Sequence, residues 1–229
     1  MRAAVQYDYG PPSVVSVADV PQPSPGDGEL LVKVHATSVN RTDCGFRAAA
    51  PPIVRLFSGL RNPKRPTLGN EFAGVVTDIG PGVTRFEVGD RIFGFIEGPF
   101  GGHAEYLVVG QDASIATIPP NITDHQAAAG TEGSHYALAY TTAGRVGPGM
   151  DVMVYGATGA IGSAAVQIAK HLDATVTAVC ATDQLDLVAG LGADRVVDYT
   201  TGDFTDDGQR YDVVLDAVGK SSWGRASSC

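Results

Sequence analysis

Three regularly spaced glycines are the strongest chemical signal in the sequence. Gly156, Gly159 and Gly162 stand in YGATGAIGSAAVQIAK, between the apolar run DVMVY and a segment with the small residues of a packed helix. Glycines between a strand and a helix let backbone N–H groups approach a pyrophosphate, and the helix N-terminus favours the anion. The spacing is GxxGxxG rather than the commoner GxGxxG, so a purely structural role in close strand–helix packing is the alternative. The flanking strand–helix–strand pattern favours dinucleotide binding.

The end of the next apolar run, ATVTAVC, should lie near the ribose of such a nucleotide. A site that prefers NAD places an acidic residue about twenty residues beyond the last glycine, where it holds the ribose hydroxyls. Cys180, Ala181 and Thr182 stand there instead, and their small neutral side chains leave room for a 2′-phosphate. Asp183 follows, and we interpret it as the N-cap of the next helix rather than as a ribose ligand. These residues favour NADPH, with NADH as the alternative.

Two kinds of local pattern must position these residues. Residues 1–122 contain short β-type runs between Pro and Gly signals, which predict a mostly antiparallel, barrel-like domain; the runs are SVVSV, ELLVKVHATSV, EFAGVVTDI, DRIFGFI and AEYLVV. Residues 123–229 alternate between helical and strand patterns: DHQAAAGTEGSHYALAYTTAGR, DVMVYG, AIGSAAVQIAKHL, ATVTAVC, DQLDLVAGLG, RVVDY and YDVVLDAVG. The alternation predicts a doubly wound parallel sheet of the Rossmann type, and the overall fold class is α/β.

The composition excludes several classes of protein. Of the 229 residues, 44% are hydrophobic and 18% are charged, as expected of a folded chain. The net charge of -9 repels nucleic acid and anionic lipid, and we interpret the basic cluster from Arg55 to Arg65 as a solvated loop. The cysteines Cys44, Cys180 and Cys229 form no metal-binding pair, and no apolar run approaches the roughly 20 residues of a membrane span. We therefore expect a cytoplasmic protein with a small-molecule substrate.

With both halves in view, the chain resembles the medium-chain dehydrogenase/reductase superfamily, and within it the zinc-independent, zeta-crystallin-like quinone oxidoreductases. The resemblance covers essentially the whole chain, with the motifs in family order: ELLVKVHATSVNRTD, LGNEFAGVVTDIGPGVTRFEVGDRIFGF, GGHAEY, YGATGAIGSAAVQIAK and YDVVLDAVG. It implies a GroES-like N-terminal domain, a Rossmann-type NAD(P)-binding domain, and hydride transfer from NADPH to a quinone or an α,β-unsaturated carbonyl.

The resemblance also implies roles for individual residues. Asn40 borders the nicotinamide and the substrate and is the candidate for positioning them. Gln184 and Tyr199 lie near the adenosine phosphate, although Tyr199 can equally be a strand-edge aromatic. Relatives often carry Lys where Gln184 stands, so weaker discrimination in favour of NADP is expected. The predicted cofactor-binding residues are Thr131, Gly156, Thr158, Gly159, Ala160, Ile161, Gly162, Thr182, Gln184, Tyr199, Ala217, Val218 and Gly219.

Members with a catalytic zinc have a Cys where Asn40 stands, a His where Asn70 stands, and a third ligand near Gly130. Because zinc needs three such protein ligands, the resemblance implies that this chain holds no zinc, and a zinc alcohol dehydrogenase is the last-ranked alternative. Glu71 is expected to be a structural acid that pairs with a nearby base or backbone donor. The five histidines lack ligand spacing and are expected to be structural.

Two departures from the family leave alternatives open. Enoyl-thioester reductases of the superfamily use a tyrosine in the N-terminal domain as proton donor, but no Tyr lies between Tyr9 and Tyr106, and Phe46 follows NRTDCG. A classical cofactor sheet has six strands, whereas about four are predicted before KSSWGRASSC. The resemblance therefore implies further strands, a helix and a return segment beyond Cys229, and their loss makes a homodimer doubtful. The second hypothesis is a truncated nucleotide-binding remnant that is catalytically weak or inert.

Overall fold

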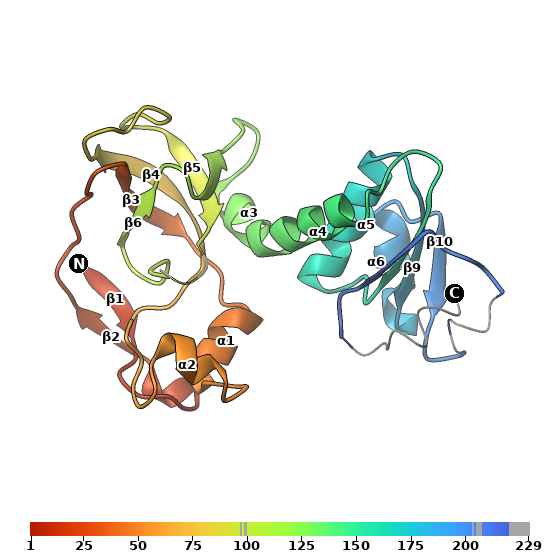
Figure 1. Cartoon of the computed structure of the whole chain (residues 1–229), viewed down its shortest axis with the longest axis horizontal. Coiled ribbons are helices and arrows are strands. Elements are labelled where there is room, and N and C mark those ends of the chain that lie inside the picture. The colour runs from red at the N-terminus through yellow and green to blue at the C-terminus, as the bar shows by residue number, and fades with distance from the viewer. Residues whose placement is uncertain (97, 99, 203, 205–207, 220–229) are drawn as a thin grey trace. The chain divides into compact units, whose positions relative to one another are not determined.

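The computed structural model describes residues 1–96, 98, 100–202, 204 and 208–219, and the segment KSSWGRASSC lies outside them. The chain divides into two compact units, Met1–Thr131 and Glu132–Cys229, called unit 1 and unit 2 below (Figure 1). Among the described residues, no helix is both long and apolar enough to cross a bilayer. The order of the two units confirms the predicted sequence of a β-rich part followed by a parallel α/β part.

Unit 1 is built on an antiparallel sheet of five strands in the order β6-β3-β4-β5-β7 (Figure 1). The strands are β3 (Glu29–Ala36), β4 (Glu71–Ile79), β5 (Arg91–Phe95), β6 (Tyr106–Gly110) and β7 (Ser114–Thr117). Apolar side chains on β3, β4 and β5, including Leu30, Val32, Phe72 and Ile92, are fully buried and form the core. β1 (Arg2–Val5) and β2 (Ser16–Asp19) form a separate antiparallel pair. The predicted strand SVVSV is only partly confirmed, because Pro12–Val14 is a 3-10 turn.

Three helices complete unit 1: α1 (Arg41–Ala48), α2 (Val54–Ser58) and α3 (Asp124–Ala129). The first two were not predicted. In α1, the sequence RTDCGFRA carries a glycine and no helical apolar stripe, and its start depends on a capping box between Asn40 and Asp43. The helical segment predicted from residue 124 onward is two helices, because α3 ends at Ala129, with Gly130 as its C-cap, and a second helix begins at Thr131.

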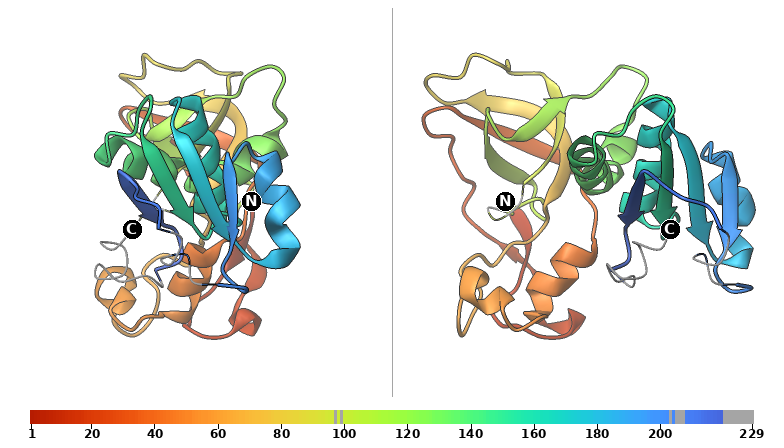
Figure 2. Two further views of the ribbon diagram at one scale, coloured as in Figure 1. Left: turned by 90° about the vertical axis from the view of Figure 1, so that its right-hand side faces the viewer. Right: turned by 45° about the vertical axis from the view of Figure 1, so that its right-hand side comes forward.

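Unit 2 is a parallel sheet of four strands in the order β10-β9-β8-β11, seen face on in Figure 2, left. The strands are β8 (Asp151–Tyr155), β9 (Thr175–Cys180), β10 (Arg195–Asp198) and β11 (Val213–Asp216). The helices are α4 (Thr131–Ala143), α5 (Ala160–His171) and α6 (Leu185–Gly190). The chain moves from β8 to β9 and β10 on one side and returns to place β11 on the other side. The gap between the ends of β8 and β11 is therefore the topological switch point, where open parallel sheets bind their ligands.

Close packing in unit 2 depends on small residues. Val166 and Ala169 of α5 are fully buried against the strand residues Val152 and Val176. Gly133 brings α4 against the start of α5, since a Cβ atom on it would lie 2.5 Å from the carbonyl oxygen of Ala160. The helix that carries the predicted phosphate site is thus fixed on two sides.

Candidate functional site

The glycine turn joins β8 to α5 and needs glycine at two of its three positions. Gly156 has a φ of +80°, a left-handed conformation that other residues rarely adopt. A Cβ atom on Gly162 would lie 2.1 Å from the carbonyl oxygen of Gly156, so the helix approaches the turn too closely for a side chain. Gly159 is the N-cap of α5 with a φ of -73°, and its added Cβ would meet only Gly156 O, at 3.7 Å. The first and third glycines therefore create the cradle.

The first turn of α5 presents backbone donors at the carboxyl edge of the sheet. The bond from the Ser163 N–H to Gly159 O, 2.8 Å long, closes the first turn of the helix. The N–H groups of Ala160, Ile161 and Gly162 precede that bond, so they have no acceptor within the helix. Together with the helix dipole they favour an anion at this point. Thr158, in the exposed part of the turn, lies beside them in the chain.

The predicted segment from Ala217 to Gly219 lies beside the glycine turn. The N–H of Ala217 donates to Tyr155 O at 3.0 Å, and Asp216 Oδ1 accepts from the N–H groups of Val218 and Gly219 at 2.9 Å. A Cβ atom on Gly156 would come within 2.1 Å of Val218 Cγ2. The structure thus brings two predicted parts of the cofactor site together across the switch point. Their contact with a nucleotide stays a prediction.

The ends of β9 and β10 meet at a carboxylate. The Thr182 hydroxyl donates to Asp198 Oδ2 at 2.6 Å, and Thr200 Oγ1 lies 2.7 Å from Thr182 Oγ1. The hydroxyls of Thr182 and Thr200 hold the pKa of Asp198 below its usual value, so the group stays ionised. Burial raises the pKa of the Cys180 thiol, with Asp198 and Asp183 adding to the effect. The strand end that the sequence predicted to be small and neutral therefore lies beside the negative charge of Asp198.

The neighbouring residues Asp183, Gln184 and Tyr199 also lie at this edge. Asp183 belongs to a 3-10 turn, Thr182–Gln184, and Gln184 is the N-cap of α6 without a side-chain cap bond, so the predicted N-cap role of Asp183 is wrong. Gln184 Nε2 donates to Asp183 Oδ2 at 3.2 Å. The ring of Tyr199 stands edge-on to that of Tyr155, with centroids 6.3 Å apart. This places Tyr199 near the carboxyl end of β8, whose last residue is Tyr155.

In unit 1, Asn40 is the centre of a polar cluster at the start of α1. Its Oδ1 accepts from the Asp43 N–H at 3.0 Å, and its Nδ2 donates to Asn70 Oδ1 at 2.6 Å and to Glu71 Oε2 at 3.2 Å. The Ser38 hydroxyl donates to the same oxygen of Glu71. Asn70 and Glu71 are buried, so the cluster fixes the carboxamide of Asn40. Asn40 and Asn70 are thus hydrogen-bonded to each other. Glu71, which was expected to pair with a base or a backbone donor, accepts from the Ser38 hydroxyl and the Asn40 amide.

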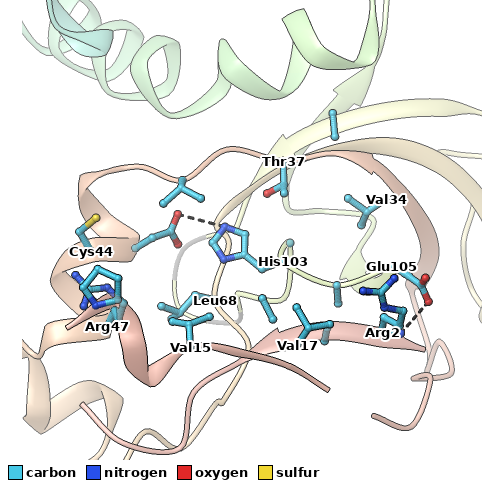
Figure 3. A pocket seen from close by; sticks show the side chains of 18 of the residues that line it. Arg2, Val15, Val17, Val34, Thr37, Cys44, Arg47, Leu68, His103 and Glu105 are labelled. Carbon is cyan, nitrogen blue, oxygen red and sulfur yellow. Dashed lines mark hydrogen bonds and ion pairs between the residues drawn. The ribbon is translucent and has the colours of Figure 1, made fainter. Parts of the chain in front are cut away.

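A buried acid and a histidine that the sequence reasoning did not pair lie next to this cluster. Asp43 accepts from the N–H groups of Asn40 and Gly69 at 3.2 and 3.0 Å, and its Oδ2 lies 3.6 Å from His103 Nε2. Burial raises the pKa of Asp43, while His103 opposes the rise. Both residues line a cavity of about 700 Å³ in unit 1. Figure 3 shows His103 inside it, with Leu68 and apolar valines around it.

Thr131 is buried at the start of α4, and its hydroxyl donates to Ala128 O at 2.6 Å. Its position along the cofactor cleft stays a prediction. Among the residues that the structure describes, no three His, Cys, Asp or Glu side chains gather as a metal site.

Comparisons with known proteins agree with this architecture. Residues 26–120 match the family described as alcohol dehydrogenase GroES-like domain, and residues 160–229 match the family described as zinc-binding dehydrogenase. The quinone-oxidoreductase QR1 of Triphysaria versicolor is 34% identical over 97% of this chain and 70% of its own length. The NADPH-dependent alkenal/one oxidoreductase of Arabidopsis thaliana is 33% identical over 96% of this chain, which spans only 58% of that protein. The names of both relatives describe them as chloroplastic.

A solved structure shows the same fold. The quinone oxidoreductase from Coxiella burnetii superposes with a TM-score of 0.85 over 96% of this chain and 69% of its own, at 28% identity. The predicted GroES-like and Rossmann-type architecture is confirmed by this match and by the parallel sheet of unit 2.

Proposed function

The chain belongs to the medium-chain dehydrogenase/reductase superfamily, where it is quinone oxidoreductase-like, and we propose that it transfers hydride from NADPH to a quinone or an α,β-unsaturated carbonyl without zinc. The observation that carries the proposal is the glycine cradle at the switch point of unit 2. There the start of α5 and the segment after β11 lie side by side. The names of the relatives support the class of acceptor.

The residues present fit a dinucleotide. Gly162 lets the start of α5 approach the glycine turn, since a Cβ there would lie 2.1 Å from Gly156 O, and the N–H groups of Ala160 and Ile161 lie at the same edge of the sheet. When bound, the nicotinamide supplies the hydride. The chain's own part is to hold the pyrophosphate at α5 and to present the fixed carboxamide of Asn40 to the substrate. A reduced quinone can take its proton from water, so no side chain is required as an acid.

The contact between Asn40 and Asn70 supports the zinc-free part of the proposal. These are the positions where the zinc-containing members have Cys and His, and here the two carboxamides bond to each other at 2.6 Å. Zinc sites are built from thiolate, imidazole and carboxylate ligands, which a carboxamide pair does not offer. Metal analysis of the purified chain tests this part, and about one zinc per chain would contradict it.

The proposal has three further parts, which concern the cofactor, the location and the partner. NADPH is proposed as the main cofactor because the small side chains of Cys180, Ala181 and Thr182 leave room for a 2′-phosphate. NADH is proposed as a substitute because the carboxylate of Asp198 lies beside Thr182 and would repel that phosphate. A cytoplasmic location is proposed from the composition, although the relatives named above are chloroplastic. The partner is proposed to be a small molecule, with no nucleic acid or membrane.

The test is a fluorescence titration of the chain with NADPH and separately with NADH, followed by acceptor assays with a quinone and an enone. We expect saturable binding that favours NADPH, and oxidation of NADPH only when an acceptor is present. Binding without turnover would support the second candidate, an inert nucleotide-binding remnant. If a folded sample binds neither nucleotide, the proposed function is wrong.

A further inference from the structure

A second cavity in unit 1 is bordered by a buried amide without a partner. The side chain of Gln6 is almost fully buried, and neither Nε2 nor Oε1 has a hydrogen-bond partner within the part of the chain that the structure describes. The backbone of Gln6 is fixed, because its N–H donates to Pro66 O at 2.8 Å. Burial of an amide that makes no hydrogen bond is destabilising, and such groups are rare in native proteins. The amide therefore points to a ligand.

The cavity has the size and the walls of a small-molecule site. Its volume is about 470 Å³, within the usual range for ligand pockets. Four aromatic side chains line it: Tyr9, Phe46, Phe57 and Phe100. The Tyr9 hydroxyl is held by Ser58 Oγ at 2.7 Å and by Gly59 O at 2.8 Å, and the rings of Phe46 and Phe100 pack edge to face with centroids 4.7 Å apart. The fixed rings of Tyr9, Phe46 and Phe100 suit a flat ring system.

The chemistry of the walls defines the ligand further. An amide presents one donor and one acceptor side by side, and its complement is a carbonyl next to an N–H or O–H. Lys64 and Arg65 also line the cavity, so the positive charge disfavours a cationic ring and favours an electron-rich one. Both amide atoms of Gln6 are closed to water in this structure, so a ligand reaches them only when the Gln6 side chain turns toward the cavity.

We propose that this cavity binds a flat, neutral or anionic ring compound with a carbonyl next to an N–H or O–H, and that Gln6 anchors it through two hydrogen bonds. All the residues involved belong to unit 1. The site goes beyond the proposed function, because binding needs no nucleotide.

The test uses a matched pair of probes and a matched pair of variants. The probes are 2-quinolone, which has the carbonyl next to an N–H, and N-methyl-2-quinolone, which lacks the donor. The variants are Gln6→Leu, which keeps the size but removes both polar atoms, and Gln167→Leu, which changes an exposed glutamine of α5. Calorimetric titrations of the full chain are made without NADPH.

We expect 2-quinolone to bind the wild-type chain and Gln167→Leu equally. It should bind Gln6→Leu at least about tenfold more weakly, because two hydrogen bonds are lost. N-methyl-2-quinolone keeps only the carbonyl acceptor, so it should bind more weakly than 2-quinolone and distinguish the variants less. Gln6→Leu should also melt at a higher temperature, since it removes an unsatisfied buried group. Should that variant fail to fold, the side-chain amide resonance of Gln6 in the wild-type chain replaces it, and 2-quinolone should shift that signal.

Two results would overturn the proposal. One is equal binding of both probes to the wild-type chain, or no binding of either. The other is binding of 2-quinolone to Gln6→Leu as tight as to the wild type, or an unchanged Gln6 resonance. Nucleotide binding is measured separately, so a chain that binds NADPH but not 2-quinolone loses only this inference.

Discussion

The glycine cradle makes a prediction that compares two neighbouring positions, Gly162→Ala and Gly159→Ala. A Cβ at residue 162 would lie 2.1 Å from Gly156 O and 2.9 Å from Ala157 Cα, whereas a Cβ at residue 159 would meet only Gly156 O, at 3.7 Å. Ordinary contacts begin near 3.4 Å, so Gly162→Ala forces the helix and the turn apart by about 1.3 Å, while Gly159→Ala forces nothing. The obstacle at residue 162 is backbone, which cannot rotate away as a side chain can.

The size of the effect follows from the packing. Overpacking a tight site costs about 1–3 kcal/mol, and the better helix propensity of Ala returns up to about 1 kcal/mol. We expect Gly162→Ala to lower the free energy of unfolding of unit 2 by about 2 kcal/mol. A turn displaced by more than about 1 Å also loses at least one hydrogen bond to a charged phosphate, which weakens NADPH binding by about tenfold or more. Gly159→Ala should cost about 0.5–1 kcal/mol as an N-cap change and leave affinity within about threefold.

Urea unfolding and NADPH fluorescence titration of the two variants measure both effects. Each variant is the control for the other, because they differ only in which glycine of the same turn gains a methyl group. If Gly162→Ala binds NADPH as tightly as Gly159→Ala and unfolds at the same urea concentration, the close approach of α5 is not the reason for the glycine. The reasoning from the cradle would then be refuted.

Three further predictions concern charge and capping. Asp198→Asn keeps the acceptor for Thr182 but removes a charge, so titrations should show a severalfold shift in preference from NADH toward NADPH; an unchanged ratio contradicts this. Burial raises the pKa of the Asp124 carboxyl, but the hydrogen bonds from Arg91 and then His35 outweigh this effect and lower the pKa below 3.8. The ionised carboxylate therefore stabilises the fold above pH 3.8, and this stabilisation is lost as the pH falls through the pKa of the folded state. Asp124→Asn should therefore flatten the acid limb of a plot of unfolding free energy against pH. Both Asn40→Ala and Asn40→Ser lose the bonds to buried Asn70 and Glu71, but Asn40→Ser keeps an N-cap oxygen and should be about 1 kcal/mol more stable than Asn40→Ala. Both should lower kcat/KM, so full activity of Asn40→Ser refutes the positioning role.

The sequence predicted the fold where periodicity is strong. The buried strands β4 and β8 were located by their apolar runs, and the glycine motif marked the start of α5. Helix α1 was missed because its start depends on side-chain hydrogen bonds between Asn40 and Asp43 rather than on an apolar stripe. Capping bonds of this kind leave only a weak pattern in the sequence.

In the site, the sequence correctly predicted which residues lie at the end of one strand, but not which side chains a neighbouring strand brings beside them. Counting residues from Gly162 correctly located the end of β9, and the side chains there are small, as the sequence shows. The charge at that edge comes from Asp198, which lies 16 residues beyond Thr182 on the adjacent strand. Nothing in the spacing of one strand indicates which side chain the next strand brings to its end. The same limit applied to His103 and Asp43, which meet from distant segments of unit 1.

The position of Asp198 changes what should be expected of cofactor choice in this chain. In the usual description, an acidic residue at the end of the second strand selects NAD, and its absence permits NADP. Here the second strand, β9, lacks that acid, but Asp198 at the end of the third strand, β10, accepts a hydrogen bond from Thr182 just after β9. Asp183 adds a second negative charge nearby. A 2′-phosphate at this edge meets two anions, and Gln184 offers an amide in place of a cation. Preference for NADPH should therefore be weak and should increase with ionic strength, because salt screens the repulsion between exposed charges. Selectivity that did not change with salt would show that neither carboxylate faces the phosphate.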